Sequence, residues 1–315
     1  MKFLITGVHG FVGSNLVSYL KDKNEIYGLD IISPEKEGVI KTYSWDDLKA
    51  GNVPAVDAIV HLAGKAHDTK NQAAAEVYFK VNRDLTIDIF DYFLSHPIKK
   101  FIFFSTAKAA ADKVDGILTE DVVPSPVGPY GESKIAAEKY ILNCKKSNPY
   151  IFEGKDFYIF RPCMIHGPGN KGNLNLLYNV VSKGIPWPLG AFENRRTFTS
   201  IENICFAVNG VLTMDVPSGI YNMGDDEALS TNELIEEICK SLGKKAHIWR
   251  LPKGLMISIA KVGGCLHLPL NLERLRKLTE NYISSNAKIK AALGVDRMPV
   301  DARDGLKVTL DSFKQ

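Results

Sequence analysis

The chain has 315 residues, 45% hydrophobic and 24% charged, which is the composition of a folded globular protein with one large domain and a smaller lobe. A formal net charge of +3, with no block of Lys or Arg, argues against a nucleic-acid partner. The five cysteines are scattered without a Cys-x-x-Cys pair, which predicts reduced thiols in a cytoplasmic protein rather than disulfides or a metal site.

The first expected strand, Lys2–Thr6, leaves no room for a signal peptide. It is followed by Gly7, Gly10 and Gly13 and then by an apolar helix through Leu20. Glycines at this spacing, between a strand and a helix, allow a tight turn and bring a pyrophosphate close to backbone N–H groups at the helix N-terminus. The alternative is a glycine-rich turn that binds nothing.

The second expected strand, Glu25–Asp30, ends in a carboxylate. Asp30 can accept hydrogen bonds from ribose hydroxyls and repels a 2′-phosphate, so we predict NAD rather than NADP. No Arg follows it directly, and only Lys36 lies soon after. A solvated acid at a strand end is the alternative. The next strand, Ala58–Leu62, runs into the small residues of His61-Leu-Ala-Gly64, which suit backbone that passes close to a dinucleotide; we expect His61 itself to be structural.

Strands and helices continue to alternate through about residue 165. Helices are expected at Val77–Ser95 and Ser133–Lys145, and strands at Lys100–Phe104 and Asp156–Phe160. This pattern predicts an α/β fold with a Rossmann-type, doubly wound parallel sheet covered by helices on both faces.

Tyr130 and Lys134 are four residues apart at the start of the second of these helices. The spacing places a phenol and an ammonium on one helical face, where the cation favours the phenolate and lowers the tyrosine pKa from about 10. Such pairs occur by chance, but this one accompanies a nucleotide loop and a hydroxyl pair, Ser105-Thr106, after an apolar strand. The three features together predict hydride transfer on a carbinol or ketone.

Beyond about residue 165, Gly- and Pro-rich loops separate short helices, one of them at Thr231–Leu242 after a capping-box sequence. We predict a Rossmann domain at 1–166 that regains the chain at about 200–222. A smaller, discontinuous C-terminal substrate lobe would comprise 167–199 and 223–315. The apolar stretch Leu255–Leu272 is broken by Lys261, two glycines and Pro269, which favours a core or lobe helix over contact with a membrane surface and argues against a span.

Seven motifs resemble those of the extended short-chain dehydrogenase/reductase family, in the family's order and over nearly the whole chain. They are Thr6–Gly13, His61–Gly64, Ser105-Thr106, Tyr130-x-x-x-Lys134, Arg161–Gly169, Arg196–Asn203 and Tyr221–Gly224. Within the family the chain is most similar to nucleotide-sugar enzymes that act at C4: UDP-galactose and UDP-N-acetylglucosamine 4-epimerases and UDP-quinovosamine 4-keto reductases. The 4,6-dehydratases carry two acids after the threonine, whereas this chain has Ala107-Lys108, so dehydration is disfavoured.

The resemblance implies a role for each matching residue. Tyr130 would transfer the proton, Thr106 would hydrogen-bond the sugar hydroxyl, and Lys134 would bind the nicotinamide ribose. The cofactor contacts would be Gly7, Gly10, Phe11, Val12, Gly13, Asp30, Leu62, Ala63, Gly64, Asn82, Ser105, Tyr130, Lys134 and Pro162. The substrate contacts would be Thr106, Lys108, Asn173, Leu174 and Arg196, and no metal is expected. The alternatives are a helix-surface amide at Asn82, a loop cap at Asn173 and a surface arginine at Arg196.

Two positions depart from the family pattern. His166 stands where a tyrosine is usual, and either alters the sugar pocket or only packs there. Ala109-Ala110-Ala111 lacks the usual aromatic residue near the sugar, and a smaller wall would admit an N-acetyl group or another ring pose.

The predicted function is NAD-dependent 4-epimerisation of a UDP-hexose or UDP-N-acetylhexosamine, through a transient 4-keto intermediate, in polysaccharide biosynthesis. The resemblance also implies a homodimer, formed through the helices around Val77–Ser95 and Ser133–Lys145. The alternative is an NAD(P)H-dependent 4-keto reductase of a UDP-2-acetamido-2,6-dideoxy sugar; such one-way reductases more often use NADPH, so Asp30 favours the epimerase. A non-catalytic nucleotide sensor is less favoured, because it has no need to retain Thr106, Tyr130 and Lys134.

Overall fold

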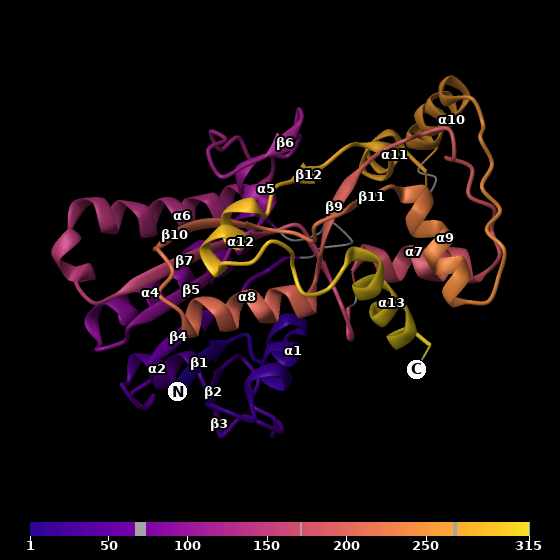
Figure 1. The fold of residues 1–315 in the computed structure, drawn as a ribbon. Helices are drawn as coiled ribbons and strands as arrows, with labels where there is room; N and C mark the ends of the chain where they lie inside the picture. Colours follow the sequence, from indigo (N-terminus) through magenta and orange to yellow (C-terminus); the bar gives the residue numbers. More distant parts are fainter. Residues whose placement is uncertain (67–73, 171, 267–269, 315) are drawn as a thin grey trace.

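The computed structural model describes residues 1–66, 74–170, 172–266 and 270–314, without the side chain of residue 265 (Figure 1). Its main body is a parallel seven-stranded sheet in the order β10-β7-β5-β4-β1-β2-β3. The strands are β1 Lys2–Thr6, β2 Glu25–Leu29, β3 Lys41–Tyr43, β4 Ala58–His61, β5 Lys100–Phe104, β7 Asp156–Pro162 and β10 Gly219–Met223. The central strands are buried and apolar, as expected of parallel strands covered on both faces.

Two hydrophobic cores, one on each face, attach helices to this sheet. On one face the core includes residues of α1 (Phe11–Leu20), α8 (Ile201–Thr213) and α12 (Ala287–Leu293). On the other it includes residues of α2 (Trp45–Lys49), α4 (Leu85–Ser95) and α6 (Pro129–Ser147). The prediction of a Rossmann-type α/β fold is confirmed.

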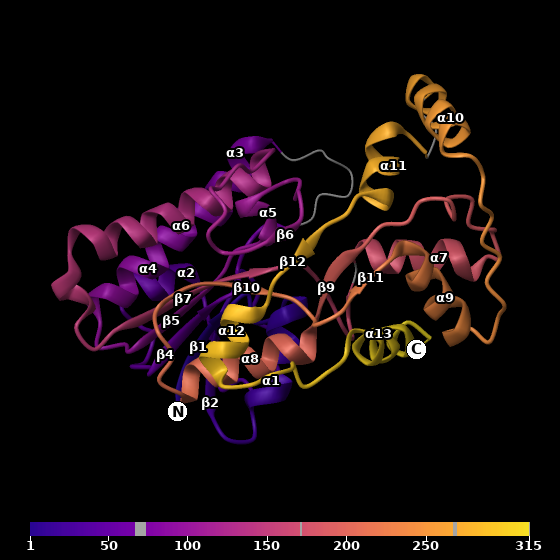
Figure 2. The same ribbon diagram turned by 45° about the horizontal axis from the view of Figure 1, so that its top comes forward.

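A second group of helices, α7, α9, α10, α11 and α13, encloses a separate core beside the sheet (Figure 2). Their bounds are Asn173–Ser182, Thr231–Ser241, Lys253–Cys265, Leu272–Thr279 and Ala302–Ser312. A small sheet of β8 (Met164–His166), β9 (Arg196–Ser200) and β11 (Ala228–Leu229) joins this smaller lobe to the end of β7. Because β8 directly follows β7, and β6 (Ile117–Leu118) after β5 pairs with β12 (Ile283–Ser284), the lobe is attached at the carboxyl edge of the main sheet.

Three elements differ from the expectation. The helix over 75–95 is α3 (Ala75–Phe79), a π-helical turn at Lys80–Asp84 and then α4. Helix α6 begins four residues earlier than expected, because Pro129 suits a first helical position and Gly128 precedes it with a left-handed φ of 85°. The apolar stretch after residue 255 forms α10 and part of α11, and its residues 267–269 lie outside the described part.

None of the helices in the described ranges combines the length and the apolarity needed to cross a membrane.

Candidate active site

The glycine loop makes a close turn between β1 and α1. Gly7 has a left-handed φ of 68°, and a Cβ at this position would lie 2.9 Å from the backbone nitrogen of Ala63. A Cβ at Gly13 would lie 2.4 Å from the carbonyl oxygen of Gly7. Helix α1 has Gly10 as its N-cap, and no side chain of the described residues caps its first turn. The loop therefore combines close backbone approach with free N–H donors, as a pyrophosphate requires.

The other residues of this loop region pack around the same turn. The N–H groups of Leu62 and Ala63 both donate to Thr6 Oγ1, at 3.1 and 3.0 Å. Phe11 packs against the loop at Gly167–Gly169, and Asn15, which the sequence interpretation missed, donates to the carbonyl of Pro168 at 3.0 Å. The start of α1 is thus held against the loop that enters the smaller lobe.

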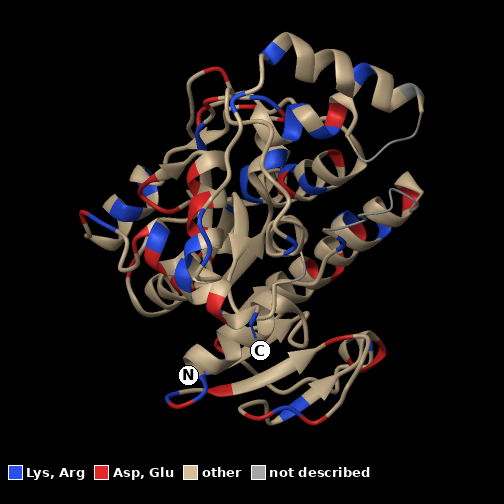
Figure 3. Ribbon diagram, turned by 90° about the vertical axis from the view of Figure 1, so that its right-hand side faces the viewer, with Lys and Arg blue, Asp and Glu red and all other residues tan. Residues whose placement is uncertain are grey.

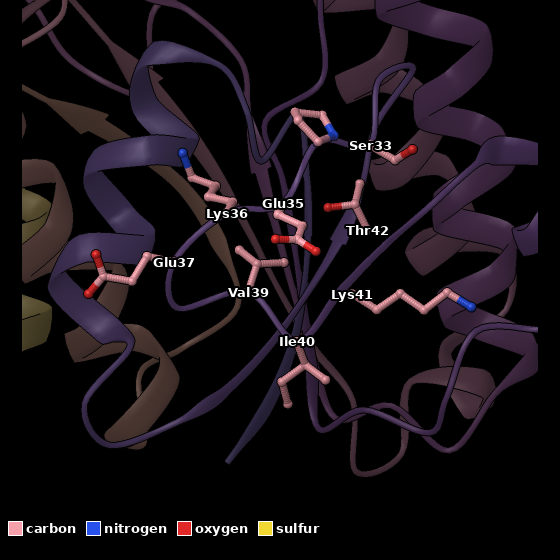
Figure 4. A pocket seen from close by; sticks show the side chains of 9 residues that line it. Ser33, Glu35, Lys36, Glu37, Val39, Ile40, Lys41 and Thr42 are labelled. Atoms are coloured by element: carbon pink, nitrogen blue, oxygen red, sulfur yellow. The ribbon is translucent and has the colours of Figure 1, made fainter.

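Asp30 lies beside the glycine loop at the end of β2. Its carboxylate accepts the backbone N–H of His9 at 3.1 Å and that of Ile31 at 2.7 Å. A hollow of about 650 Å³, lined by residues from Ser33 to Thr42, opens next to it (Figure 4). His9 Nε2 reaches Thr42 Oγ1 at 3.2 Å, which joins the hollow to the same loop. The Asp30 carboxylate, the glycine loop and this hollow therefore lie next to one another.

Lys36 lines that hollow and donates to Ser14 Oγ of α1 at 2.9 Å. It is the lysine noted in the sequence shortly after Asp30. The cation is therefore held at the first turns of α1, while the carboxylate of Asp30 stands at the strand end.

His61 occupies a buried structural position. Its Nδ1 and Nε2 form hydrogen bonds with Thr6 Oγ1 at 2.7 Å and Thr86 Oγ1 at 2.9 Å. Burial lowers its pKa well below 6.5, so the ring stays neutral. The geometry agrees with a structural role.

Asn82 is fully buried in the π-helical turn, so it is not a surface amide. Its Oδ1 accepts the N–H of Lys65 at 2.7 Å, while its Nδ2 donates to the Lys65 carbonyl at 3.1 Å and to Ser133 Oγ at 3.0 Å. A Cβ at Gly64 would lie 3.0 Å from Asn82 Oδ1 and 3.1 Å from Lys134 Nζ. Asn82 thus fixes the backbone after β4 against α6, and π-helical turns often mark such functional positions.

Thr106, Tyr130 and Lys134 come together at the carboxyl end of β5. Thr106 is the N-cap of α5 (Ala107–Ala110), and the Tyr130 phenol hydrogen-bonds with it. Lys134 Nζ donates to the carbonyl of Phe104, the last residue of β5, at 2.7 Å. Tyr78, which the sequence interpretation missed, presents its ring edge-on to Tyr130 with the centroids 6.4 Å apart.

The expected lowering of the Tyr130 pKa is wrong for this structure. Burial raises the pKa of Tyr130 above its usual value of 10, and the hydrogen bond with Thr106 offsets only part of this. Lys134 is directed at the Phe104 carbonyl, and burial lowers its own pKa from 10.5 to about 8. The phenol is therefore a weaker acid at this position than a free tyrosine.

A buried ion pair lies directly behind Lys134 and was not foreseen. Glu138, one turn along α6, accepts two hydrogen bonds from Arg161 Nε, at 3.0 and 3.1 Å, and one from Nη2. Ser105 Oγ also donates to Glu138. Ser105 is therefore placed next to Thr106 but is engaged by this pair, and Pro162 is buried at the end of β7 beside Arg161.

On the expected substrate side, Lys108 and Arg196 form one group of charged side chains with Asp112, Arg276 and Glu280. Lys108 Nζ donates to Asp112 Oδ1 at 3.1 Å and lies 4.0 Å from Glu280 Oε1. Arg276 contacts both of these acids. Arg196 donates to the Lys277 carbonyl at the end of α11, and Glu280 raises its pKa against a larger lowering by burial. Arg196 is therefore not a solvated surface residue.

Asn173 and Leu174 lie outside this charged group, at the start of α7. Asn173 is exposed, whereas the side chain of Leu174 is 1% exposed in the core of the smaller lobe. A ligand at this helix start can reach Leu174 only through its backbone.

The two departures from the family pattern have structural explanations. His166 is buried, with Nδ1 bonded to Thr309 Oγ1 at 2.9 Å and Nε2 at 3.6 Å from Asp225 Oδ2, which favours packing over a role at the sugar. An aromatic residue from a distant part of the chain contacts the alanine segment at 109–111. Tyr282 donates its hydroxyl to the carbonyl of Ala111 at 2.9 Å, and Lys108 Nζ lies 4.7 Å from its ring centroid.

A protein-family model covers most of the chain, including these site residues. The model of the NAD dependent epimerase/dehydratase family matches residues 3–224. The chain belongs to this family. It contains the glycine loop, Asp30 and all three residues gathered at the end of β5 within the matched region, and the predictions of an NAD-dependent enzyme and of NAD as cofactor are confirmed at the level of the family.

Several proteins that are similar to this chain are 4-epimerases of UDP-sugars. The UDP-glucose 4-epimerase of Vibrio cholerae is 29% identical over 100% of this chain and 96% of its own length. The UDP-N-acetylglucosamine 4-epimerase from Bacillus cereus matches in structure with a TM-score of 0.77 and 20% identity, over 100% of both chains. The Thermus thermophilus UDP-glucose 4-epimerase, solved with NAD, has a TM-score of 0.75 and 22% identity, over 100% of this chain and 99% of its own. At identities of 20% and 22%, these two structures show that the chain shares their fold.

Proposed function

We propose that the protein is a 4-epimerase of a UDP-hexose or UDP-N-acetylhexosamine that works through a transient 4-keto sugar. The observation that supports this most is the meeting of Thr106, Tyr130 and Lys134 at the end of β5, two strands from the glycine loop after β1. The carboxyl edge of such a sheet is where cofactor and substrate meet.

The residues fit NAD, with the pyrophosphate at the start of α1, one ribose at Asp30 and the nicotinamide ribose at Lys134. Bound there, NAD would supply the acceptor for the C4 hydride and the donor that returns it. Tyr130 accepts the proton of the C4 hydroxyl, which Thr106 orients, and returns it after the sugar has turned over. Because burial raises the Tyr130 pKa, the bound state must bring positive charge closer to the phenol, and Lys134, one turn along the helix, is the cation that can supply it.

The diphosphate of the substrate would bind Arg196, with Lys108 near the sugar and Asn173 and the Leu174 backbone on the nucleotide. The guanidinium and phosphate oxygens match as paired donors and acceptors. Arg196 would have to exchange the Lys277 carbonyl for phosphate, so α11 is expected to adjust when the substrate binds.

The alternative is a 4-keto reductase of a UDP-2-acetamido-2,6-dideoxy sugar. The relatives include reductases, among them the dTDP-4-dehydro-6-deoxyglucose reductase of Escherichia coli, 26% identical over 78% of this chain and 83% of its own length. Asp30 at the ribose position favours NAD, and an epimerase must keep its cofactor through the reaction, so we prefer the epimerase.

We further propose a cytoplasmic homodimer that serves polysaccharide biosynthesis. The dimer contact would use α4 and α6, which lie side by side and are linked by an exposed hydrogen bond from the Tyr140 hydroxyl to Asp91 Oδ1 at 2.6 Å.

The substrate assignment is tested with UDP as a competitor and with Arg196→Lys. UDP should compete with the sugar nucleotide, and the variant should raise KM for a UDP-sugar at least about tenfold with NAD binding unchanged, because an ammonium cannot reproduce paired donation. Arg195→Lys is the matched control, since Arg195 is exposed and pairs with Glu233. Failure of UDP to bind at millimolar concentration would mean a smaller hydroxy or keto substrate.

A further inference from the structure

Lys36 is a half-buried lysine between β2 and β3 whose ammonium reaches α1. Its Nζ donates to Ser14 Oγ at 2.9 Å. Ser14 directly follows Gly13, and its own N–H donates to the Gly10 carbonyl at 2.9 Å, which closes the first turn of α1. Because side chains on a helix tilt toward its N-terminus, the Ser14 hydroxyl holds the ammonium toward the end of α1 that adjoins the glycine loop.

The chain around Lys36 is packed along α1, so the position of the lysine does not depend on one side-chain contact. Gly38 has a left-handed φ of 82°, and a Cβ there would lie 2.7 Å from Lys21 Cβ and 3.2 Å from Val17 Cγ1. Only glycine permits this close approach. Glu37 forms an ion pair with Lys21 at 2.5 Å. Figure 4 shows the side chains of Lys36 and Glu37 on the side of this helix.

The ammonium of Lys36 lies where a cation is unfavourable. Helix α1 has partial positive charge at its N-terminal end and no acidic residue in its first turn. Among the residues that the structure describes, no carboxylate forms an ion pair with Lys36, because the adjacent Glu37 is taken up by Lys21. Figure 3 shows Lys and Arg interspersed with Asp and Glu over the molecule, so a broad basic face does not account for this lysine. Its placement is favourable once an anion binds at the start of α1.

We propose that Lys36 is a phosphate-binding residue for the cofactor and contacts the pyrophosphate of NAD. The inference rests on the proposed placement of that pyrophosphate at the start of α1. The ammonium would exchange the neutral Ser14 hydroxyl for a charged oxygen, which makes a stronger hydrogen bond. The flexible four-carbon stem of lysine allows this movement without a change of the backbone. Lys36 would thus add a side-chain cation to a site made of backbone N–H groups.

The 2′-phosphate of NADP is the other phosphate to consider. It would lie beside Asp30, whose carboxylate repels it, and Glu35 is a further acid in the lining of the adjoining hollow. The ammonium of Lys36 is bonded to α1 and not to the strand end that carries Asp30. The pyrophosphate therefore matches its position, and this decides between the two.

Calorimetry on the cofactor-free full chain tests the proposal with NAD, NADP and ADP as ligands. Lys36→Met should weaken the binding of NAD and ADP at least about tenfold, and Lys36→Arg should restore most of the affinity. The affinity of Lys36→Met for NAD should also fall less steeply than that of the wild type as salt is raised. Lys41→Met is the matched control, because Lys41 lines the same hollow but lies over the Tyr43 ring, 4.6 Å from its centroid.

Thermal unfolding midpoints equal to the wild type's would show that the variants fold. Unchanged binding of NAD and ADP by Lys36→Met, or an equal loss in Lys41→Met, would overturn the proposal. A loss confined to NADP would overturn it as well and assign Lys36 to the 2′-phosphate. No sugar nucleotide is present, so these results leave the 4-epimerase proposal untouched, whereas a wild type that does not bind NAD would overturn both.

Discussion

Burial, the hydroxyl of Thr106 and the neighbouring Tyr78 set the acidity of Tyr130, while Lys134 lies one helical turn away. Burial is the largest of these effects and raises the pKa of the phenol. The ammonium of Lys134 is meanwhile held on the Phe104 carbonyl. The residues that we propose for proton transfer thus lie together, while Lys134 is directed at the Phe104 carbonyl.

Tyr130→Phe should abolish turnover and leave NAD binding within about twofold of the wild type, because only the proton-transfer hydroxyl is removed. Steady-state kinetics and calorimetry measure the two quantities. Tyr150→Phe is the matched control, since Tyr150 is 82% exposed beyond the end of α6. Turnover by Tyr130→Phe within about tenfold of the wild type would assign the proton to another group.

The pKa of Lys134 predicts a pH-dependent cost to stability. Its value is about 8 in the folded protein and 10.5 as the reference for an unfolded chain, so the unfolded chain binds more protons between these values. This group therefore makes stability rise with pH across that window, and below it costs on the order of 3 kcal/mol.

Urea unfolding of the cofactor-free protein measures this cost through Lys134→Met. Relative to the wild type, the variant's free energy of unfolding should be raised most at pH about 7, and this difference should disappear toward pH about 10. Lys139→Met, exposed on the same helix, should show a difference independent of pH. A constant difference for Lys134→Met as well would mean that Lys134 titrates normally.

Asp30→Ala should lower the affinity for NAD by about tenfold or more and narrow the preference over NADP, because the carboxylate accepts the ribose hydroxyls and repels a 2′-phosphate. Calorimetry with both cofactors measures the change. Asp22→Ala, an exposed acid ahead of β2, is the control. Equal or tighter binding of NADP by the wild type would remove the main reason for preferring the epimerase.

At the level of elements, α6 is the structural centre of the site. It carries Tyr130 and Lys134, and Glu138 on its next turn ties it to β7 through Arg161. Both partners of this pair are at most 1% exposed. Breaking such a pair leaves a charge buried without its counterion.

Glu138→Ala should therefore destabilise the protein by about 3–5 kcal/mol, measured by denaturant unfolding. Glu138→Gln keeps one acceptor oxygen but replaces the other by an NH2 donor that faces Arg161 and removes the negative charge, so it should also destabilise the protein. Lys139→Ala, the exposed neighbour, should change stability by less than about 0.5 kcal/mol. A small effect of Glu138→Ala would indicate that water or another group replaces the carboxylate.

The elements of the main sheet were predictable because their sequences are locally consistent. Apolar strands at 2–6, 58–61 and 100–104, and the glycine turn after the first, allow few other structures. The π-helical turn at Lys80–Asp84 was not predictable, since it depends on how Asn82 reaches the backbone of Lys65 and the hydroxyl of Ser133. The short strands β3, β6, β8, β11 and β12 likewise depend on their partners rather than on their own residues.

The same distinction applies to the site. Gly7, Gly13 and Asp30 lie where the sequence placed them, because each position follows from one strand and the turn after it. The charged group around Lys108 and Arg196 and the contact of Tyr282 with Ala111 join segments more than 80 residues apart, so spacing gave no sign of them. The direction of the Tyr130 pKa shift was predicted wrongly, because the burial of the phenol and the hydrogen bond of Lys134 to the Phe104 carbonyl arise only in the folded chain.

At the scale of the whole molecule, the smaller lobe is tied to the sheet at points that surround the site. Strand β12 pairs with β6, and Arg196 donates a hydrogen bond to the end of α11. Arg276 contacts Asp112 next to α5. A sugar nucleotide between Tyr130 and Arg196 would touch both lobes, so substrate binding is expected to change the contacts of α11.

The central claim is reversible transfer of the C4 hydrogen to the cofactor and back to the same sugar. The most direct measurement uses UDP-hexose and UDP-N-acetylhexosamine labelled with deuterium at C4, a catalytic amount of protein with NAD, and no added reductant. The account predicts that for at least one sugar both C4 epimers form and the deuterium remains at C4. Unchanged substrates, together with NADPH-dependent reduction of a 4-keto sugar nucleotide, would contradict it and establish the reductase.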